Sequence, residues 1–266
     1  MKDILTEIVE NKRTELRATK AFLPLDDLRR LVEKKIEAEG LKLRSMRDSL
    51  RNSASGIISE FKRKSPSKGW IHEDAKVTEV VPKYAANGAS AISILTDNKY
   101  FGGNQNFIRD VRSLIETPIL RKDFIVDEYQ LYEAKLIGAD AVLLIAADLT
   151  KTKCNSLLQK AHELGLEVLL EIHDEKELNY VTPDVDMLGV NNRHLGTFHT
   201  DVEQSFKIAD QLSKEFTLVS ESGISKAETV KQLREIGFRG FLIGETFMKE
   251  SDPGIALKNF IQQVEG

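Results

Sequence analysis

The sequence is poor in cysteine: Cys154 is the only one among 266 residues, so no disulfide can form within the chain. A chain without disulfides fits a reducing compartment. Cys154 stands between Lys153 and Asn155 near the start of a helical pattern, and no neighbour marks it as a reactive thiol. We therefore interpret it as a structural residue.

Long apolar runs are also missing. No stretch approaches the roughly 18 apolar residues that a membrane-spanning helix needs. The first residues, MKDILTEIVENKRTELR, are charged throughout and lack the apolar segment of a secretory signal peptide. These absences predict a cytoplasmic protein that does not bind membranes.

Metal-ligand spacings and excess positive charge are absent as well. The five histidines, at positions 72, 162, 173, 194 and 199, form no HExxH pattern, so we expect no catalytic metal. The net charge of −4 and the pI near 5.9 argue against a protein that coats nucleic acid. The composition, 41% hydrophobic and 30% charged, is that of a globular protein.

Two kinds of pattern follow one another along the chain. Residues 1 to about 50 carry apolar residues at the spacing of amphipathic helices. From Gly56 onward, eight short and nearly continuous apolar runs predict parallel strands, with room for one helix between each pair. The runs are Ile57–Phe61, Ala91–Leu95, Pro118–Leu120 with its continuation, Ala141–Ala146, Glu167–Ile172, Met187–Val190, Thr217–Val219 and Phe241–Ile243.

Glycines punctuate this alternation. The phrases NGASAISIL, IGADAVLLI, LGLEVLLEI and IGFRGFLIG each place a glycine where a helix would end, just before a strand. The pattern predicts a (β/α)8 barrel, or TIM barrel, as a single domain over residues 1–266, with residues 1–50 as a helical extension. A doubly wound open sheet is the alternative, but no GxGxxG follows the first predicted strand.

In such a barrel, chemistry gathers where the strands end. A lone Lys or Glu at a strand end is usually half of a solvated ion pair, but here ionisable or amide groups follow most of the predicted strands. Burying so many without a ligand would cost several kcal/mol each. We therefore predict a site that contains Glu60, Lys62, Lys122, Phe124, Glu171, Asn191 and Arg193.

The last two strand ends predict an anion site. Ser222-Gly223 and Gly244-Glu245 lie where this fold commonly binds phosphate through backbone N–H groups. The Glu245 side chain would repel an anion, so we expect it to turn away.

The segment SEFKRKSPSKG after the first strand adds positive charge to this region. We expect Lys62 and Ser65 to face the anion, and Arg63 and Lys64 to be solvated. Arg193 would hold a second anionic group, such as a carboxylate, through its bidentate guanidinium.

The remaining groups suit acid–base chemistry. Lys122, with apolar and cationic neighbours in the sequence, is predicted to have a lowered pKa and to act as a general acid. Glu60 and Glu171 would act as bases or hold the lysines in position. Asn191 would hydrogen-bond a hydroxyl group of the ligand.

Seven segments, in order along nearly the whole chain, resemble the indole-3-glycerol phosphate synthase family. The resemblance implies a (β/α)8 barrel that closes the indole ring of 1-(2-carboxyphenylamino)-1-deoxyribulose 5-phosphate, with loss of carbon dioxide and water, in tryptophan biosynthesis. It implies a phosphorylated small-molecule substrate, no cofactor or metal, and no obligate protein partner. The segments are SEFKRKSPSKG, SILTDNKYFGG, PILRKDFIVDEYQLYEAKLIGADAVLLI, LLEIHDEKEL, GVNNRHL, VSESGI and FLIGETFM.

The resemblance also implies roles. Lys122 resembles the general acid, Glu171 the catalytic glutamate, and Glu60 the second carboxylate. Lys62 would bind substrate and assist dehydration, Asn191 and Arg193 would orient substrate, and Phe124 would pack on its aromatic ring. The phosphate would be held by Ser65, Ser222, Gly223, Gly244 and Glu245. One departure is His194, because the family commonly has Asp there beside the arginine.

Two other functions remain alternatives. A phosphoribosylanthranilate isomerase would lack the first 50 residues and use a Cys–Asp pair, whereas Cys154 follows the fourth predicted strand and not the first. A non-catalytic barrel that binds a phosphorylated ligand would be expected to lose an acid or a base. The sequence retains Glu60, Lys62, Lys122 and Glu171.

Overall fold

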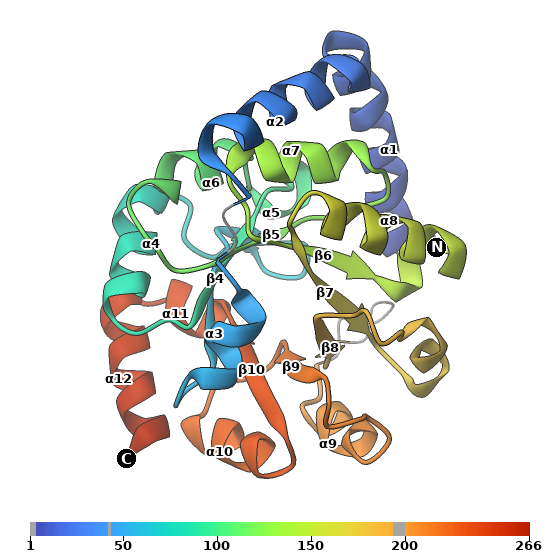
Figure 1. Ribbon diagram of the computed structural model, residues 1–266. Helices are drawn as coiled ribbons and strands as arrows, with labels where there is room; N and C mark the ends of the chain where they lie inside the picture. Colours follow the sequence, from blue (N-terminus) through green and yellow to red (C-terminus); the bar gives the residue numbers. More distant parts are fainter. Residues whose placement is uncertain (1–3, 42–43, 194–199) are drawn as a thin grey trace.

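The computed structural model describes residues 4–41, 44–193 and 200–266. Within these ranges eight parallel strands form a closed barrel, and helices surround it (Figure 1). The predicted fold class is confirmed. The barrel strands, in order around the ring, are β1 (Ile57–Phe61), β4 (Ala91–Leu95), β5 (Ile119–Lys122), β6 (Ala141–Ile145), β7 (Glu167–Ile172), β8 (Met187–Asn191), β9 (Thr217–Glu221) and β10 (Phe238–Ile243).

Several strand ends differ from the sequence prediction. β8 and β9 continue past the apolar run because Asn191 and Glu221 still pair with each other in the ladder. β10 begins three residues earlier, at Phe238, before a register shift at Gly240. Polar residues at these ends belong to the strands themselves, so their side chains are held by the barrel rather than by loops.

Helices follow the strands as predicted, and the extension before β1 is helical. A short hairpin, β2 (Lys64–Ser65) and β3 (Gly69–Trp70), interrupts the first crossover. None of the helices in the described ranges has the length and apolar character needed to span a bilayer. The helices are α1 (Ile4–Phe22), α2 (Leu25–Glu39), α3 (Met46–Asn52), α4 (Val77–Ala86), α5 (Asn98–Phe101), α6 (Asn106–Arg112), α7 (Tyr129–Ile137), η1 (Ala146–Asp148), α8 (Lys151–Glu163), η2 (Glu175–Tyr180), α9 (Glu203–Ala209), α10 (Ala227–Glu235), α11 (Glu245–Met248) and α12 (Pro253–Glu265).

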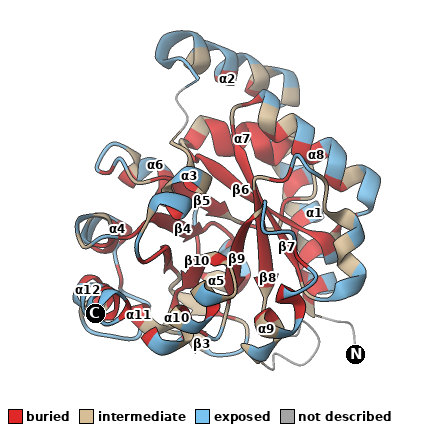
Figure 2. Ribbon diagram, turned by 60° about the horizontal axis from the view of Figure 1, so that its bottom comes forward, coloured by how far each residue is buried: buried red, intermediate tan, exposed pale blue. Residues whose placement is uncertain are grey.

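The core has two layers, as expected for parallel strands that are covered on both faces. One apolar cluster fills the barrel, and a larger one lies between the strands and the helices. Figure 2 shows buried strands at the centre and helices whose outer faces are exposed. The predicted helix-ending glycines are confirmed, since Gly88, Gly138, Gly165 and Gly237 all have positive φ.

The N-terminal helices cover different parts of the barrel. α2 lies along α7 on the outside (Figure 1). α3 closes the amino-terminal end of the barrel, where Met46 and Leu50 are fully buried in the inner cluster. Glu167, the first residue of β7, fixes α3 because its carboxylate accepts hydrogen bonds from the Met46 N–H at 2.7 Å, the Arg47 N–H at 3.0 Å and the Ser45 hydroxyl at 2.6 Å.

Replacing this carboxylate tests the stabilising role of the amino-terminal end. We expect Glu167→Ala to lower the free energy of unfolding by about 2–4 kcal/mol, because one buried and two partly buried donors lose a charged acceptor. Glu116→Ala is the matched control, since Glu116 pairs with Arg44 at 2.8 Å but is 89% exposed, and surface pairs contribute about 0–1 kcal/mol. Urea unfolding measures both. Equal effects of the two substitutions would contradict the assignment.

Candidate active site

A cavity of about 450 Å³ opens where the strands end. Nearly all the predicted site residues line it, although they come from six strands and the turns that follow them. The lining includes Glu60, Lys62, Lys122, Phe124, Glu171, Asn191, Arg193, Ser222, Gly223, Gly244 and Glu245. Their catalytic and binding roles stay predictions, but the sequence pattern did identify residues that meet in space.

Ser65 is the exception. It is 2% exposed in the hairpin, its Oγ has no hydrogen-bond partner, and it is not part of the cavity lining. Its neighbours Pro66, Ser67 and Lys68 line the cavity instead. The role of Ser65 as a phosphate ligand therefore stays a prediction.

The Lys122 ammonium lies among carboxylates in the cavity. Its Nζ lies 3.3 Å from Glu221 Oε2 and 3.4 Å from Glu171 Oε2. Burial alone would lower the pKa of Lys122, but the charges of Glu221, Glu171 and Glu60 outweigh burial and raise it. The predicted lowered pKa was wrong, because the sequence neighbours of Lys122 do not reveal the carboxylates that β1, β7 and β9 bring to it.

Glu60 of β1 and Lys62, which directly follows the strand, lie on the same side, as the alternation of strand side chains predicts. Glu60 Oε1 and Lys62 Nζ form an ion pair at 2.7 Å. Burial raises the pKa of Glu60, but Lys62 and Lys122 outweigh it and lower the pKa. Gly244 leaves room for this pair, since a Cβ there would lie 2.5 Å from Glu60 Oε1.

Glu221 is a site residue that the sequence interpretation missed. It is 1% exposed, lies against Lys122, and neither carboxylate oxygen makes a hydrogen bond of good geometry. Burial raises its pKa to about 8, with Glu171 adding to the rise and Lys122 opposing it. Gly189 accommodates it, because a Cβ there would overlap Glu221 Oε1. The sequence did contain a signal for Glu221. Side chains two apart on a strand share a face, and Val219 of the same strand points into the barrel, so Glu221 does too.

The raised pKa of Glu221 gives stability a defined pH dependence. Between its ordinary pKa of 4.5 and about 8, the folded state binds a proton that the unfolded state does not. The contribution of Glu221 to the free energy of unfolding therefore decreases as pH rises through this window. Gln cannot ionise, so the Glu221→Gln protein should be more stable than the parent towards pH 9. Its Tm should be higher by about 2–4 °C for each kcal/mol that ionised Glu221 costs the parent. Thermal unfolding of both proteins between pH 6 and pH 9 checks this, and a Tm difference that is independent of pH would contradict it.

The turn after β9 has left-handed backbone at two successive residues. Ser222 has a φ of +70°, unlike any other non-glycine in the described ranges, and Gly223 follows with a φ of +79°. A left-handed non-glycine residue costs about 1–3 kcal/mol and persists only where its surroundings enforce it. Here the Asn192 side chain donates to the Ser222 carbonyl at 3.1 Å. At residue 223 a Cβ would lie 2.5 Å from Thr200 Cγ2, so glycine is required.

Glu245, at the start of α11, does not stand as an unpaired charge beside this turn. Its Oε1 pairs with Lys68 Nζ at 2.9 Å. Burial raises the pKa of Glu245, but the contact with Lys68 outweighs it and lowers the pKa. Lys68, from the hairpin after β1, thereby offsets the negative charge that the sequence interpretation found awkward.

Arg63 was expected to be solvated, and that expectation was wrong. Its guanidinium donates to the Gly102 carbonyl at 2.8 and 3.2 Å. It also stacks on Trp70 and Phe107, with centroid distances of 5.6 and 5.2 Å. Arg63 thus joins the loop after β1 to the loop after β4. Lys64 contributes to the same junction by donating to the Lys99 carbonyl at 3.2 Å.

Arg193 lies at the opposite side of the mouth. Its backbone N–H donates to Asn191 Oδ1 at 3.0 Å, and it pairs with Thr200 in an isolated antiparallel bridge. The sequence departure at His194 lies outside the described residues.

An apolar wall completes the cavity. Phe124 and Phe101 lie 6.0 Å apart between ring centroids. Ile4, Leu5 and Ile8 of α1 line the same cavity, so the helical extension forms part of the site.

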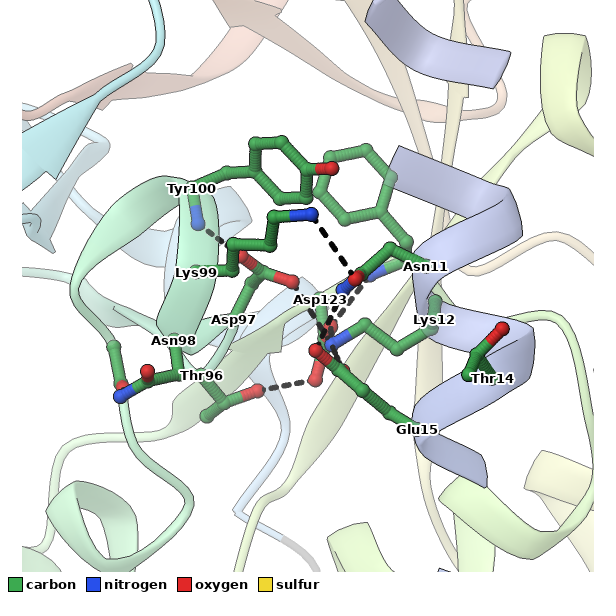
Figure 3. Close-up of polar contacts among 12 residues, drawn as sticks. Asn11, Lys12, Thr14, Glu15, Thr96, Asp97, Asn98, Lys99, Tyr100 and Asp123 are labelled. Carbon is green, nitrogen blue, oxygen red and sulfur yellow. Dashed lines mark hydrogen bonds and ion pairs between the residues drawn. The ribbon is translucent and has the colours of Figure 1, made fainter. Parts of the chain in front are cut away.

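A buried lysine fixes α1 in this position. Lys12 Nζ lies 2.9 Å from Asp97 and 3.1 Å from Asp123, at the ends of β4 and β5, and 3.0 Å from Glu15 of its own helix (Figure 3). Burial lowers the pKa of Lys12, but Asp123 and Asp97 outweigh it and raise the pKa. Tyr100 adds a second contact to α1 through its hydroxyl, which donates to Glu7 at 2.9 Å.

Removing the Lys12 charge leaves buried carboxylates without their counter-ion. We expect Lys12→Met to lower the free energy of unfolding by about 3–5 kcal/mol. Lys20→Met on the same helix is the control, because Lys20 and Asp127 pair at 2.8 Å but are 37% and 30% exposed. Urea unfolding compares the two, and a loss below about 1 kcal/mol for Lys12→Met would refute the role of this contact.

Fold and site together define a (β/α)8-barrel enzyme whose lysines and carboxylates surround a cavity with the left-handed turn of Ser222 and Gly223 on one side and an aromatic wall on another. A family model described as indole-3-glycerol phosphate synthase matches residues 5–260. An indole-3-glycerol phosphate synthase of Bacteroides thetaiotaomicron is 57% identical over 265 residues, covering all of both chains, and one of Chromobacterium violaceum is 40% identical over 258 residues, covering 97% of each. The chain belongs to the indole-3-glycerol phosphate synthase family, as the sequence resemblance predicted.

Solved structures of low sequence identity support the fold alone. A 3-hexulose-6-phosphate synthase from Salmonella typhimurium is similar with a TM-score of 0.60 at 17% identity, covering 79% of this chain and 98% of that one. A thiamine phosphate pyrophosphorylase from Pyrococcus furiosus has a TM-score of 0.60 at 16% identity, with coverage of 83% and 98%.

Proposed function

We propose that the chain converts 1-(2-carboxyphenylamino)-1-deoxyribulose 5-phosphate into indole-3-glycerol phosphate, with release of carbon dioxide and water. The observation that carries the proposal is the buried ammonium of Lys122 among Glu60, Glu171 and Glu221, in a cavity lined by the left-handed turn of Ser222 and Gly223 and by an aromatic wall. The substrate carries a phosphate, a carboxylate, an aromatic ring and a ketone. Each has a chemically matching group in the cavity.

Binding uses the two ends of the cavity. The phosphate binds at the turn formed by Ser222 and Gly223 and at Gly244 and Glu245, through backbone N–H groups. The aromatic ring packs on Phe124. Arg193 holds the substrate carboxylate through charge-assisted hydrogen bonds, and Asn191 binds a hydroxyl group.

Ring closure begins when the ring carbon that bears the carboxylate attacks the ketone carbon. The new bond places negative charge on the ketone oxygen, which takes a proton from Lys122. A raised pKa does not prevent this step, because the alkoxide is more basic than an amine. Carbon dioxide then leaves, and its bonding electron pair restores the aromatic ring.

Dehydration completes the indole. The hydroxyl group formed from the ketone leaves as water after taking a proton from Lys62, whose ammonium Glu60 holds at 2.7 Å. The adjacent methylene group loses a proton to Glu171, and the electron pair forms the second ring double bond. Over both steps Lys122 and Lys62 each give one proton and Glu171 takes one, so one proton is consumed in total. One molecule each of carbon dioxide and water is released.

We also propose that residues 1–266 act as one barrel domain with residues 1–50 as its helical extension, since α1 contributes to the cavity. The protein would act in the cytoplasm without a cofactor, a nucleic acid or an obligate protein partner. The phosphorylated substrate is its expected small-molecule partner.

The decisive assay follows indole fluorescence after the protein, dialysed against a chelator, is mixed with the substrate. We expect turnover by the parent chain and a fall in kcat of about 10²–10⁴-fold for Lys122→Met, as is typical when a general acid is removed. Lys135→Met is the control, because Lys135 is also buried, at 7% exposure, but lies on α7 outside the cavity. A parent chain that binds the substrate without turnover would favour the non-catalytic alternative, and activity that returns only with a divalent cation would contradict a metal-free reaction.

A further inference from the structure

His173 adjoins Glu171 at the end of β7, and the proposed reaction gives it no part. Residues two apart on a strand share a face, so both side chains point towards the mouth. His173 Nε2 lies 3.2 Å from Glu171 Oε1, whereas Lys122 Nζ lies 3.4 Å from the other oxygen, Oε2. The Glu171 carboxylate is therefore held between two cations, one at each oxygen.

Two neighbouring elements hold His173 in turn. Glu177 of η2 accepts a hydrogen bond from the His173 backbone N–H at 2.6 Å, and the same oxygen lies 3.4 Å from His173 Nδ1. Gln204 of α9 donates to the His173 carbonyl at 2.9 Å. Neither ring nitrogen makes a hydrogen bond of good geometry, so the ring is attracted to both carboxylates mainly as a charge.

That charge is present at neutral pH. Burial lowers the pKa of His173, but the contacts with Glu171 and Glu177 outweigh it and raise the pKa to about 10. The charged groups facing the ring are Glu171 on its own strand and Glu177 on η2, and α9 contributes the neutral Gln204. Lys122 of β5 lies beyond Glu171, on the far side of the carboxylate.

We propose that His173, held by Glu177, is a positioning residue for Glu171: it fixes the carboxylate with Oε2 towards Lys122 and keeps it ionised during the reaction. The inference rests on the proposed function, because it takes Glu171 as the base of the dehydration step. The need for a second cation arises when Lys122 gives its proton to the alkoxide. Glu171 then faces a neutral amine, and the imidazolium, together with the Asn191 side chain, keeps it an anion that can accept the methylene proton.

The test compares two substitutions of different reach. His173→Asn is too short to reach Glu171 in place of Nε2, whereas His173→Gln places a neutral donor near the same point. We expect kcat to fall about 10- to 100-fold for His173→Asn and less for His173→Gln, with KM within about threefold, as when residues that orient a catalytic group are lost. The acid limb of the kcat–pH profile should move to higher pH in both, because Glu171 loses a nearby positive charge. Glu177→Gln should move the same limb by a smaller amount.

His162→Asn is the matched control. His162 Nε2 also pairs with a carboxylate, Asp186, at 2.8 Å, but Asp186 precedes β8 and lies at the opposite end of the barrel. This variant should leave kcat and its pH profile unchanged. A stable His173→Asn protein with parental kcat and an unmoved acid limb would overturn the inference.

A second readout does not need turnover. In protein labelled with ¹⁵N-histidine, the resonance that His173→Asn removes should still report a protonated ring at pH 8, and Glu171→Gln should bring its titration down towards the ordinary range. A His173 ring that is neutral at pH 7 would overturn the inference even in an active enzyme. An inactive parent chain whose His173 titration responds to Glu171→Gln would overturn the proposed function and still support the His173–Glu171 contact.

Discussion

The site depends on one arrangement of charge: a lysine ammonium, Lys122, that three strands surround with carboxylates inside the barrel. Removing such charges from water is costly, and it is tolerated only where opposite charges meet at close range. Lys62 adds a second positive charge, which forms an ion pair with Glu60. Glu221 shares Lys122 with Glu171, which His173 also contacts, so Glu221 is the carboxylate best accommodated with a proton, and burial raises its pKa to about 8. At neutral pH the site thus contains both a protonated carboxyl group, Glu221, and an ionised one, Glu171.

The remainder of the mouth is built to hold that arrangement steady. Small residues stand where a carboxylate needs space, at Gly189 and Gly244. Strained backbone at Ser222 is fixed by Asn192. Arg63 connects two loops through a backbone carbonyl and two aromatic rings. The mouth is therefore preorganised by contacts from many separate segments, which is how electrostatic stabilisation avoids reorganisation during a reaction.

The sequence predicted much of this because a barrel brings all strand ends to one face. Alternation within β1 placed Glu60 beside Lys62, and strand-end position alone selected Glu171 and Asn191. What the sequence did not predict depends on contacts between distant segments. The pKa of Lys122 rises because of residues about 50 and 100 positions away, and Arg63 is bound by the carbonyl of Gly102, in a loop that follows another strand. Ser65 was assigned from its loop, whereas the hairpin buries its side chain.

The position of Lys12 has a consequence for how the chain is made. Its partner Asp123 follows about 110 residues later, so at ribosomal rates of 5–20 residues per second α1 leaves the ribosome roughly 5 to 20 seconds before it can dock. During that interval the face that carries Ile4, Leu5 and Ile8 has no barrel to cover, and the lysine has no buried counter-ion. The first helix to be synthesised thus waits for β5 before its buried ion pairs can form. Nascent chains shorter than about 125 residues present an apolar surface for chaperones to bind.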